Sequence, residues 1–190
     1  MIKSPLQHAV ALAVLVGMSL GANAQTVTPL GDISAAAPTT FTGTVLGSQQ
    51  TFSDVFTFNL PENNISSGYN VINFPVNLGE AGSLGTIFTS MALISFGADQ
   101  QRGTADDTVL SSIDTNSPGF DQENLSLSFG ENISGSAYLL VGGATTGTLG
   151  GIYSGSIAAA VPEPETYAML LAGLGLMGAV VRRRGMRKTS

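Results

Sequence analysis

The residues of this chain that could do chemistry are almost all carboxylates, hydroxyls and amides. The sequence has thirteen Asp and Glu residues, no cysteine, and one histidine, His8, near its start. Beyond His8 there is no imidazole or thiol for a Ser-His-Asp triad, a Cys-His pair or a thiolate- or histidine-ligated zinc site. The chemistry left open is acid–base catalysis by carboxylates and calcium binding by oxygen ligands.

Asp54 is the most unusual carboxylate, because it alternates with phenylalanines in the stretch Phe52-Ser53-Asp54-Val55-Phe56. A carboxylate on an apolar strand face has to be hydrogen-bonded, paired, metal-bound or protonated. We expect it to accept hydrogen bonds from backbone N–H groups at a strand or loop edge. An ion pair with Arg102, a calcium site and a catalytic role remain as alternatives.

A second group of acids lies in a Gly-, Gln-, Asn- and Ser-rich stretch around Arg102. The segment 114–119 begins like an EF-hand loop, but Pro118 replaces a ligand and Leu125 stands where the bidentate glutamate is needed. An EF-hand is therefore excluded. A solvated acidic loop is expected, with a looser calcium loop or a glycosidase-type carboxylate pair as alternatives. The acids concerned are Asp99, Asp106, Asp107, Asp114, Asp121 and Glu123.

Charge is distributed unevenly along the chain. Of the seven basic residues, five lie beyond position 181 and one is Lys3, which leaves Arg102 alone between positions 25 and 160. That segment carries eleven acids against this one arginine, a net charge of −10. Nucleic-acid binding is excluded, because contacts to phosphates need several Lys or Arg side chains.

The first 24 residues are predicted to be a secretory signal peptide. Lys3 is followed by an apolar run at 9–20, and Ala22-Asn23-Ala24 is an A-x-A cleavage site. Cleavage after Ala24 would start the mature chain at Gln25. The passenger is accordingly expected to be exported.

The other end of the chain combines three features in a fixed order. Pro162-Glu163-Pro164 precedes an uncharged apolar run at 166–181, which is followed by Arg182-Arg183-Arg184. As a helix this run would extend about 24 Å, somewhat short of a hydrocarbon core of about 30 Å. The arginines favour a cytoplasmic end, and the prolines keep the preceding segment extended. We predict a C-terminal transmembrane helix that acts as a membrane stop, with the passenger outside.

This arrangement resembles the PEP-CTERM sorting signal over residues 161–188. The resemblance implies that an exosortase, a transpeptidase-like membrane enzyme of exopolysaccharide-producing Gram-negative bacteria, recognises the segment and removes the helix. Within the passenger, Phe52, Asp54 and Phe56 resemble the signature of the FxDxF subgroup of PEP-CTERM proteins. That subgroup carries no assigned biochemical activity.

Residues 25–160 are predicted to form a single all-β domain, a β-sandwich or jelly roll. Short alternating apolar runs are separated by turn residues, and no amphipathic helix is indicated. A final hairpin is expected from the runs that flank a Gly/Thr-rich turn. The expected strands lie at 41–45, 52–60, 72–78, 86–96 and 125–129, and the hairpin strands at 137–142 and 151–159.

These features predict an exported, non-enzymatic protein that needs no cofactor and is sorted to the cell surface or to the exopolysaccharide matrix of a biofilm or floc. The expected partners are an exosortase-type enzyme, the inner membrane at least transiently, and exopolysaccharide. A calcium-dependent carbohydrate-binding module is the alternative, and a carboxylate-based hydrolase of the matrix is a third reading.

Overall fold

The computed structural model of the protein describes residues 25–131, 133–161 and 168–178. The predicted cleavage residues Ala22 and Ala24, the Pro162–Pro164 motif and the Arg182–Arg184 cluster all lie outside the described residues. Contacts divide the chain into two compact units, Met1–Ala160 and Val161–Ser190, and each is described by itself.

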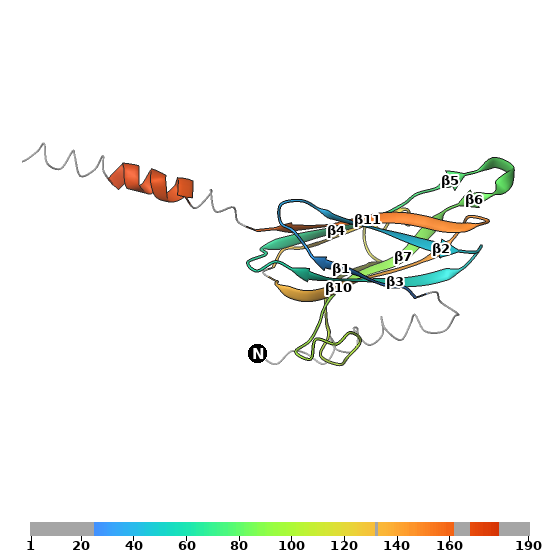
Figure 1. Cartoon of the computed structure of the whole chain (residues 1–190), viewed down its shortest axis with the longest axis horizontal. Coiled ribbons are helices and arrows are strands. Elements are labelled where there is room, and N and C mark those ends of the chain that lie inside the picture. The colour runs from blue at the N-terminus through green and yellow to red at the C-terminus, as the bar shows by residue number, and fades with distance from the viewer. Residues whose placement is uncertain (1–24, 132, 162–167, 179–190) are drawn as a thin grey trace, which may run out of the picture. The chain divides into compact units, whose positions relative to one another are not determined.

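The strands of the first unit form two sheets that pack face to face (Figure 1). Sheet A has five strands, and all of its ladders are antiparallel except that between β1 and β3, which is parallel. In spatial order its strands are β1 (Val27–Asp32), β3 (Thr51–Leu60), β10 (Gly135–Thr145), β7 (Thr86–Ser95) and β8 (Thr108–Asp114).

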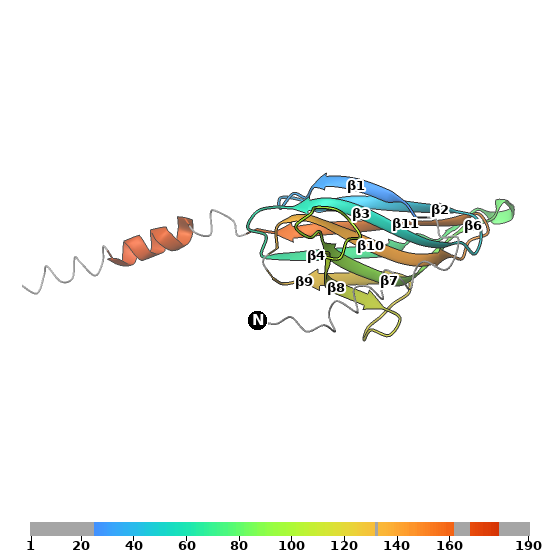
Figure 2. The same ribbon diagram turned by 90° about the horizontal axis from the view of Figure 1, so that it is seen from below.

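Sheet B has six strands, and β11 occupies its centre by pairing with β2, β4 and β6. A short 3₁₀ turn, Gly79–Ala81, connects the two-residue strands β5 and β6. At one side of the sandwich β8 of sheet A lies next to β9 of sheet B (Figure 2). The strands are β2 (Thr39–Leu46), β4 (Ser66–Asn73), β5 (Val76–Asn77), β6 (Ser83–Leu84), β9 (Asn124–Phe129) and β11 (Gly150–Ala160).

The core lies between the two sheets and follows from the two-residue period of the strands. In β3 the residues Phe52, Phe56, Phe58 and Leu60 face inward and are buried. They meet inward-facing side chains of β10 and β7 in the same sheet, and Phe41, Tyr69 and Tyr153 from sheet B are in the same cluster. The prediction of an all-β, sandwich-like fold is confirmed, whereas the jelly-roll assignment stays a prediction.

The outer face of sheet A carries a second, smaller cluster. Val55, Ala92, Ile94, Tyr138 and Leu140 are buried there, with partly buried Phe96 and Val109 packed against them. Both faces of the central strands β3, β7 and β10 are therefore apolar. This explains why the stretch at 86–96 shows no alternation in the sequence.

The predicted final hairpin is wrong. β10 pairs with β3 and β7 in sheet A, whereas β11 pairs with strands of sheet B, so the turn at 146–149 crosses from one sheet to the other. A Gly/Thr-rich turn between two apolar strands fits either connection. Here β10 pairs with two strands of sheet A and β11 pairs with three strands of sheet B, and these ladders replace the single ladder of a hairpin.

Two further strands lie where none is expected. One is β1, which contains Pro29 and a register irregularity. The other is β8, which lies inside the stretch expected to be an acidic loop. The expected strand at 72–78 is divided, because β4 ends at Asn73 and β5 begins at Val76 after Pro75. A proline cannot donate to a strand ladder, which accounts for this break.

The second unit contains a helix at 168–178, whose side chains are exposed. It falls within the apolar run expected at 166–181, the ends of which lie outside the described residues. Among the described residues, no helix has the length and apolar character required to cross a membrane.

Candidate functional site

Asp54 lies on the inner face of β3 and joins the two sheets through one hydrogen bond. The hydroxyl of Tyr153, on β11, donates to Asp54 Oδ2 at 2.6 Å, and the backbone N–H of Thr26 donates to Oδ1 at 3.2 Å. Asp54 is 3% exposed and Tyr153 is 0% exposed. The carboxylate therefore satisfies its buried oxygens with one donor from each side of the sandwich.

The two phenylalanines of the Phe52-x-Asp54-x-Phe56 pattern pack around the same tyrosine. Phe52 stacks on the ring of Tyr153 with centroids 5.3 Å apart, and Phe56 meets it edge-on at 6.4 Å. Gly43, opposite Tyr153 on β2, leaves room for this ring, since a Cβ there would collide with it. The three residues of the pattern thus surround one side chain: the two rings pack against the phenol of Tyr153, and Asp54 accepts the hydrogen bond from its hydroxyl.

The environment of this centre suppresses ionisation of the phenol. Burial, followed by the charge of Asp54 and the hydrogen bond to it, raises the pKa of Tyr153 far above its ordinary value. Arg102 is not among the hydrogen-bond partners of Asp54, so the alternative of an ion pair between them is not realised. The expected backbone N–H donor is present in Thr26, whereas a tyrosine partner is not among the alternatives expected from the sequence.

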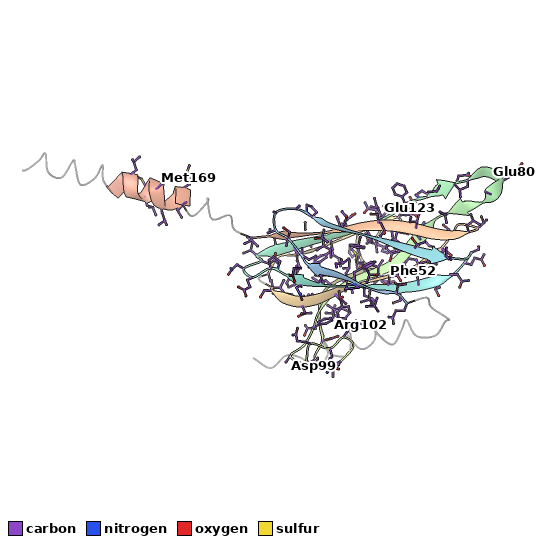
Figure 3. All side chains as sticks on the ribbon, viewed as in Figure 1. Phe52, Glu80, Asp99, Arg102, Glu123 and Met169 are labelled. Atoms are coloured by element: carbon purple, nitrogen blue, oxygen red, sulfur yellow. The ribbon has the colours of Figure 1, made fainter. Side chains whose placement is uncertain are left out.

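A second Tyr–Asp pair lies on the outer face of sheet A. Tyr138 of β10 donates its hydroxyl to Asp107 Oδ2 at 2.9 Å, and Asp107 also accepts the backbone N–H groups of Gly103 at 2.7 Å and Gly97 at 3.3 Å. Burial, then the hydrogen bond to Asp107, raises the pKa of Tyr138. Asp107 in this way fixes the loop that connects β7 to β8 and carries Asp99 and Arg102 (Figure 3).

Most of the remaining clustered acids shape turns. Asp99, Asp114 and Asp121 each accept, through Oδ1, the backbone N–H group two residues further on, at 2.8 to 2.9 Å. This is the Asx-turn arrangement by which aspartate stabilises a tight loop. The Thr104 hydroxyl donates to Asp106 at 2.7 Å and, with the backbone N–H of Asp99, lowers the pKa of that carboxyl. In residues 25–131, 133–161 and 168–178, no three acids or histidines are grouped so that they could hold a metal ion.

The outer face of sheet B is uncharged along β4, β9 and β11 and is slightly hollowed. A groove of about 360 Å³ crosses strands β4, β9 and β11 on this face. The hydroxyls of Ser126, Ser128 and Ser156 have no hydrogen-bond partner among the described residues, so they are available to a ligand. The groove is lined by Gly68, Tyr69, Asn70, Ser126, Leu127, Ser128, Ser156 and Ala158.

The end of the passenger is fixed by the side chain of Asn64. Asn64 accepts the backbone N–H of Ala160 at 3.2 Å and donates to the carbonyl of Ile133 at 3.2 Å, and the N–H of Ile65 donates to the Ala160 carbonyl at 2.9 Å. Asn64 is fully buried, so its amide, although in an Asn-x-Ser sequence, serves the fold. The last strand is therefore held to its final residue.

The C-terminal segment matches a known family. Residues 160–184 match the family described as the PEP-CTERM protein-sorting motif. This motif implies an exported protein that is anchored in a membrane and then processed by an exosortase. The match begins at the last residue of β11 and covers none of the preceding strands. The resemblance of the passenger to the FxDxF subgroup stays a prediction.

A search of curated proteins gives no match. Among solved structures, the pre-peptidase C-terminal domain of collagenase from Bacillus anthracis covers 72% of this chain and 99% of its own, with 17% identity and a TM-score of 0.37. CorA, a surface-associated copper-binding protein of Methylomicrobium album BG8, covers 72% and 100%, with 7% identity and a TM-score of 0.39. The VP2 subviral particle of infectious bursal disease virus covers 69% and 35%, with 13% identity and a TM-score of 0.29. Similarity at these TM-scores supports no conclusion about ligand or activity.

Proposed function

We propose that this protein is a non-enzymatic structural component of the cell surface or of an exopolysaccharide matrix, such as that of a biofilm or floc. The precursor is exported by its signal peptide, held at the inner membrane by the C-terminal helix with the passenger outside, and released or transferred by an exosortase. The single observation that carries the proposal is the sorting motif at residues 160–184.

The boundary between passenger and motif supports removal of the tail. The described strands all end by Ala160, and Asn64, Ile65 and Ile133 hold that end within the first unit. Cleavage near Pro162–Pro164 would therefore take no strand from the sandwich. A tail whose loss leaves the passenger whole is what a removable address requires.

The described carboxylates support a structural role for the passenger. Asp54 and Asp107 hold buried tyrosine hydroxyls, while Asp99, Asp114 and Asp121 form turns. These contacts give structural roles to Asp54 and to most of the acids around Arg102, which are the two places where catalysis is an alternative. We therefore rank matrix hydrolysis below a structural function.

Carbohydrate binding is the second candidate, and the groove on sheet B is the observation that favours it. Its side chains offer hydroxyl and amide groups without charge, which suits a neutral sugar. Since the acids near Arg102 are used in turns, this version of the hypothesis needs no calcium. Fractionation tests this candidate by measuring how much of the released protein is recovered together with the exopolysaccharide and how much is recovered without it.

The test of sorting is the intact mass of the protein recovered outside the cells, with peptide mapping of both ends. We expect a chain that starts at Gln25 and ends near Pro162. Glu163→Ala should leave the full-length chain in the inner membrane, because it removes the only charge from the Pro-Glu-Pro motif.

Glu165→Ala is the matched control for that variant, since it removes a neighbouring acid outside the motif. It should be processed like the wild-type chain. Equal release of the two variants, or an extracellular wild-type chain that still carries Arg182–Arg184, would show that the motif is not used as proposed.

A further inference from the structure

Most free edges of the two sheets are protected against pairing with another chain. β1, at one edge of sheet A, contains Pro29 and a register irregularity. At the other side β8 and β9 lie next to each other, and the ladder of β8 with β7 is also irregular. β5 and β6 are only two residues long. Proline, irregular registers, short strands and covering by a neighbour are the usual means of blocking an edge.

β2 is the exception. Its eight residues, Thr39–Leu46, contain no charge and no proline, and its ladder with β11 is regular throughout. In residues 25–131 and 133–161, β11 is its only strand partner. A long, regular and uncharged edge strand is a template for a further strand.

The backbone groups available at this edge can be identified from the ladder with β11. The N–H of Gly47 donates to the carbonyl of Leu149 at 3.0 Å, which fixes the phase of the alternating antiparallel pattern. It follows that the N–H and C=O groups of Thr40, Thr42 and Thr44 point away from β11. The side chains of these three threonines are exposed on the outer face of sheet B.

We propose that β2 is a homodimerisation edge, at which it pairs antiparallel with β2 of a second copy of this chain. A ladder centred on Thr42 pairs Thr40 with Thr44 of the second copy and joins the two B sheets into one. The outward N–H and C=O groups of both strands are then satisfied. Threonine faces threonine on the exposed side of the ladder, which is a favourable cross-strand pair.

The local absence of charge lets a second copy approach at this edge, although each passenger carries a net negative charge. Two passengers of net charge −10 repel each other, so they associate most readily where neither presents an acid. Beside β2 on the outer face lie Ile152, Ser154 and Ser156 of β11, which are uncharged. Pairing of two β2 strands thus places no acid of β2 or β11 opposite another.

Cysteine cross-linking in intact cells tests the proposal, because the natural chain has no cysteine. Thr42→Cys places two thiols opposite each other across the proposed ladder, with Cα atoms about 5.5 Å apart, within disulfide range. We expect mild oxidation or a short bismaleimide to give a covalent dimer. Ser126→Cys is the control, since it is equally exposed on the same face but lies in β9.

A second variant tests the edge without a new thiol. Thr42→Lys places two like charges opposite each other across the proposed ladder, so it should lower the sedimenting mass from dimer to monomer. Because the side chain is exposed, the far-UV circular dichroism spectrum should stay unchanged. A Thr42→Cys dimer no more abundant than that of Ser126→Cys, or an unchanged mass for Thr42→Lys, would overturn the proposal. Because β2 is present before and after processing, a failure of sorting does not affect either result.

Discussion

Two buried tyrosine–aspartate pairs lie among the residues that the structure describes, and they serve different parts of the fold. Tyr153 and Asp54 come from opposite sheets and meet in the core, where the hydroxyl–carboxylate distance is 2.6 Å. Tyr138 and Asp107 meet on the outer face of sheet A at 2.9 Å, where Asp107 belongs to a loop. The first pair connects the two layers of the fold, and the second fixes a loop to the outer face of sheet A.

The difference indicates that the same tyrosine–aspartate hydrogen bond contributes differently to stability, depending on which elements of the fold it connects. Asp54 has one backbone donor besides its tyrosine, whereas Asp107 has two and belongs to a loop. Loss of the tyrosine hydroxyl therefore leaves Asp54 poorly satisfied in the core, while Asp107 keeps most of its hydrogen bonds. The predictions below compare matched changes at the two pairs.

Truncation of the aromatic neighbours should produce the largest contrast. Phe52 stacks on Tyr153 between the sheets, so Phe52→Ala should lower the free energy of unfolding by about 3–5 kcal/mol. Phe96 lies against Tyr138 and is only partly buried, so Phe96→Ala should cost about 1–2 kcal/mol. Urea denaturation of both variants measures the two values. Equal losses would mean that the outer cluster carries as much of the fold as the core.

Removal of the two hydroxyls should give a smaller contrast of the same sign. Tyr153→Phe should cost about 2–3 kcal/mol, because it leaves the Asp54 carboxylate buried with a single donor. Tyr138→Phe should cost about 1 kcal/mol, since Gly97 and Gly103 still donate to Asp107. Thermal unfolding at neutral pH compares the two. A greater loss for Tyr138→Phe would reverse the ranking of the two pairs.

Ionisation of the buried tyrosines at alkaline pH should have the smallest of these effects on stability. Burial raises the pKa of Tyr69 to about 12 and also raises the pKa values of Tyr153 and Tyr138. The unfolded chain ionises these phenols from about pH 10, so the stabilisation is complete below that pH and is lost as the pH rises above it.

Melting temperatures at pH 8 and pH 11 measure this loss. Tyr153→Phe should lose less stability between the two values than the wild-type protein does, since it has one fewer phenol to ionise on unfolding. An equal loss would indicate that Tyr153 does not contribute to the alkaline transition.

The parts of the fold that sequence reasoning reached are those with a clear two-residue period. The alternation of Phe52, Phe56 and Phe58 with smaller residues correctly predicted β3 and its buried face. The runs that became β2, β7 and β9 were also placed within a few residues of their bounds. For these strands, the order of apolar and polar residues indicates directly whether one face or both faces are buried.

The parts that it missed depend on contacts between distant residues. β8 is mostly half-exposed and lies in an acidic stretch, so its strand character comes from pairing with β7. The partner of Asp54 could not be inferred, because Tyr153 is 99 residues away and on the other sheet. A glycine within a strand is a usable signal of such a contact. Gly43 faces Tyr153, and the absence of a side chain at Gly43 leaves the space that the large ring occupies.

The position of β10 and β11 in the sheets has a consequence for the order of events during export. β10 lies between β3 and β7, and β11 lies between β2 and β4, so the last two strands of the passenger form the middle of both layers. A chain that crosses a membrane N-terminus first cannot complete sheet A until Thr145 has emerged, or sheet B until Ala160 has emerged. Since the sorting-motif match begins at residue 160, every strand comes before the motif in the chain, so both sheets can be completed before a cleavage within the motif.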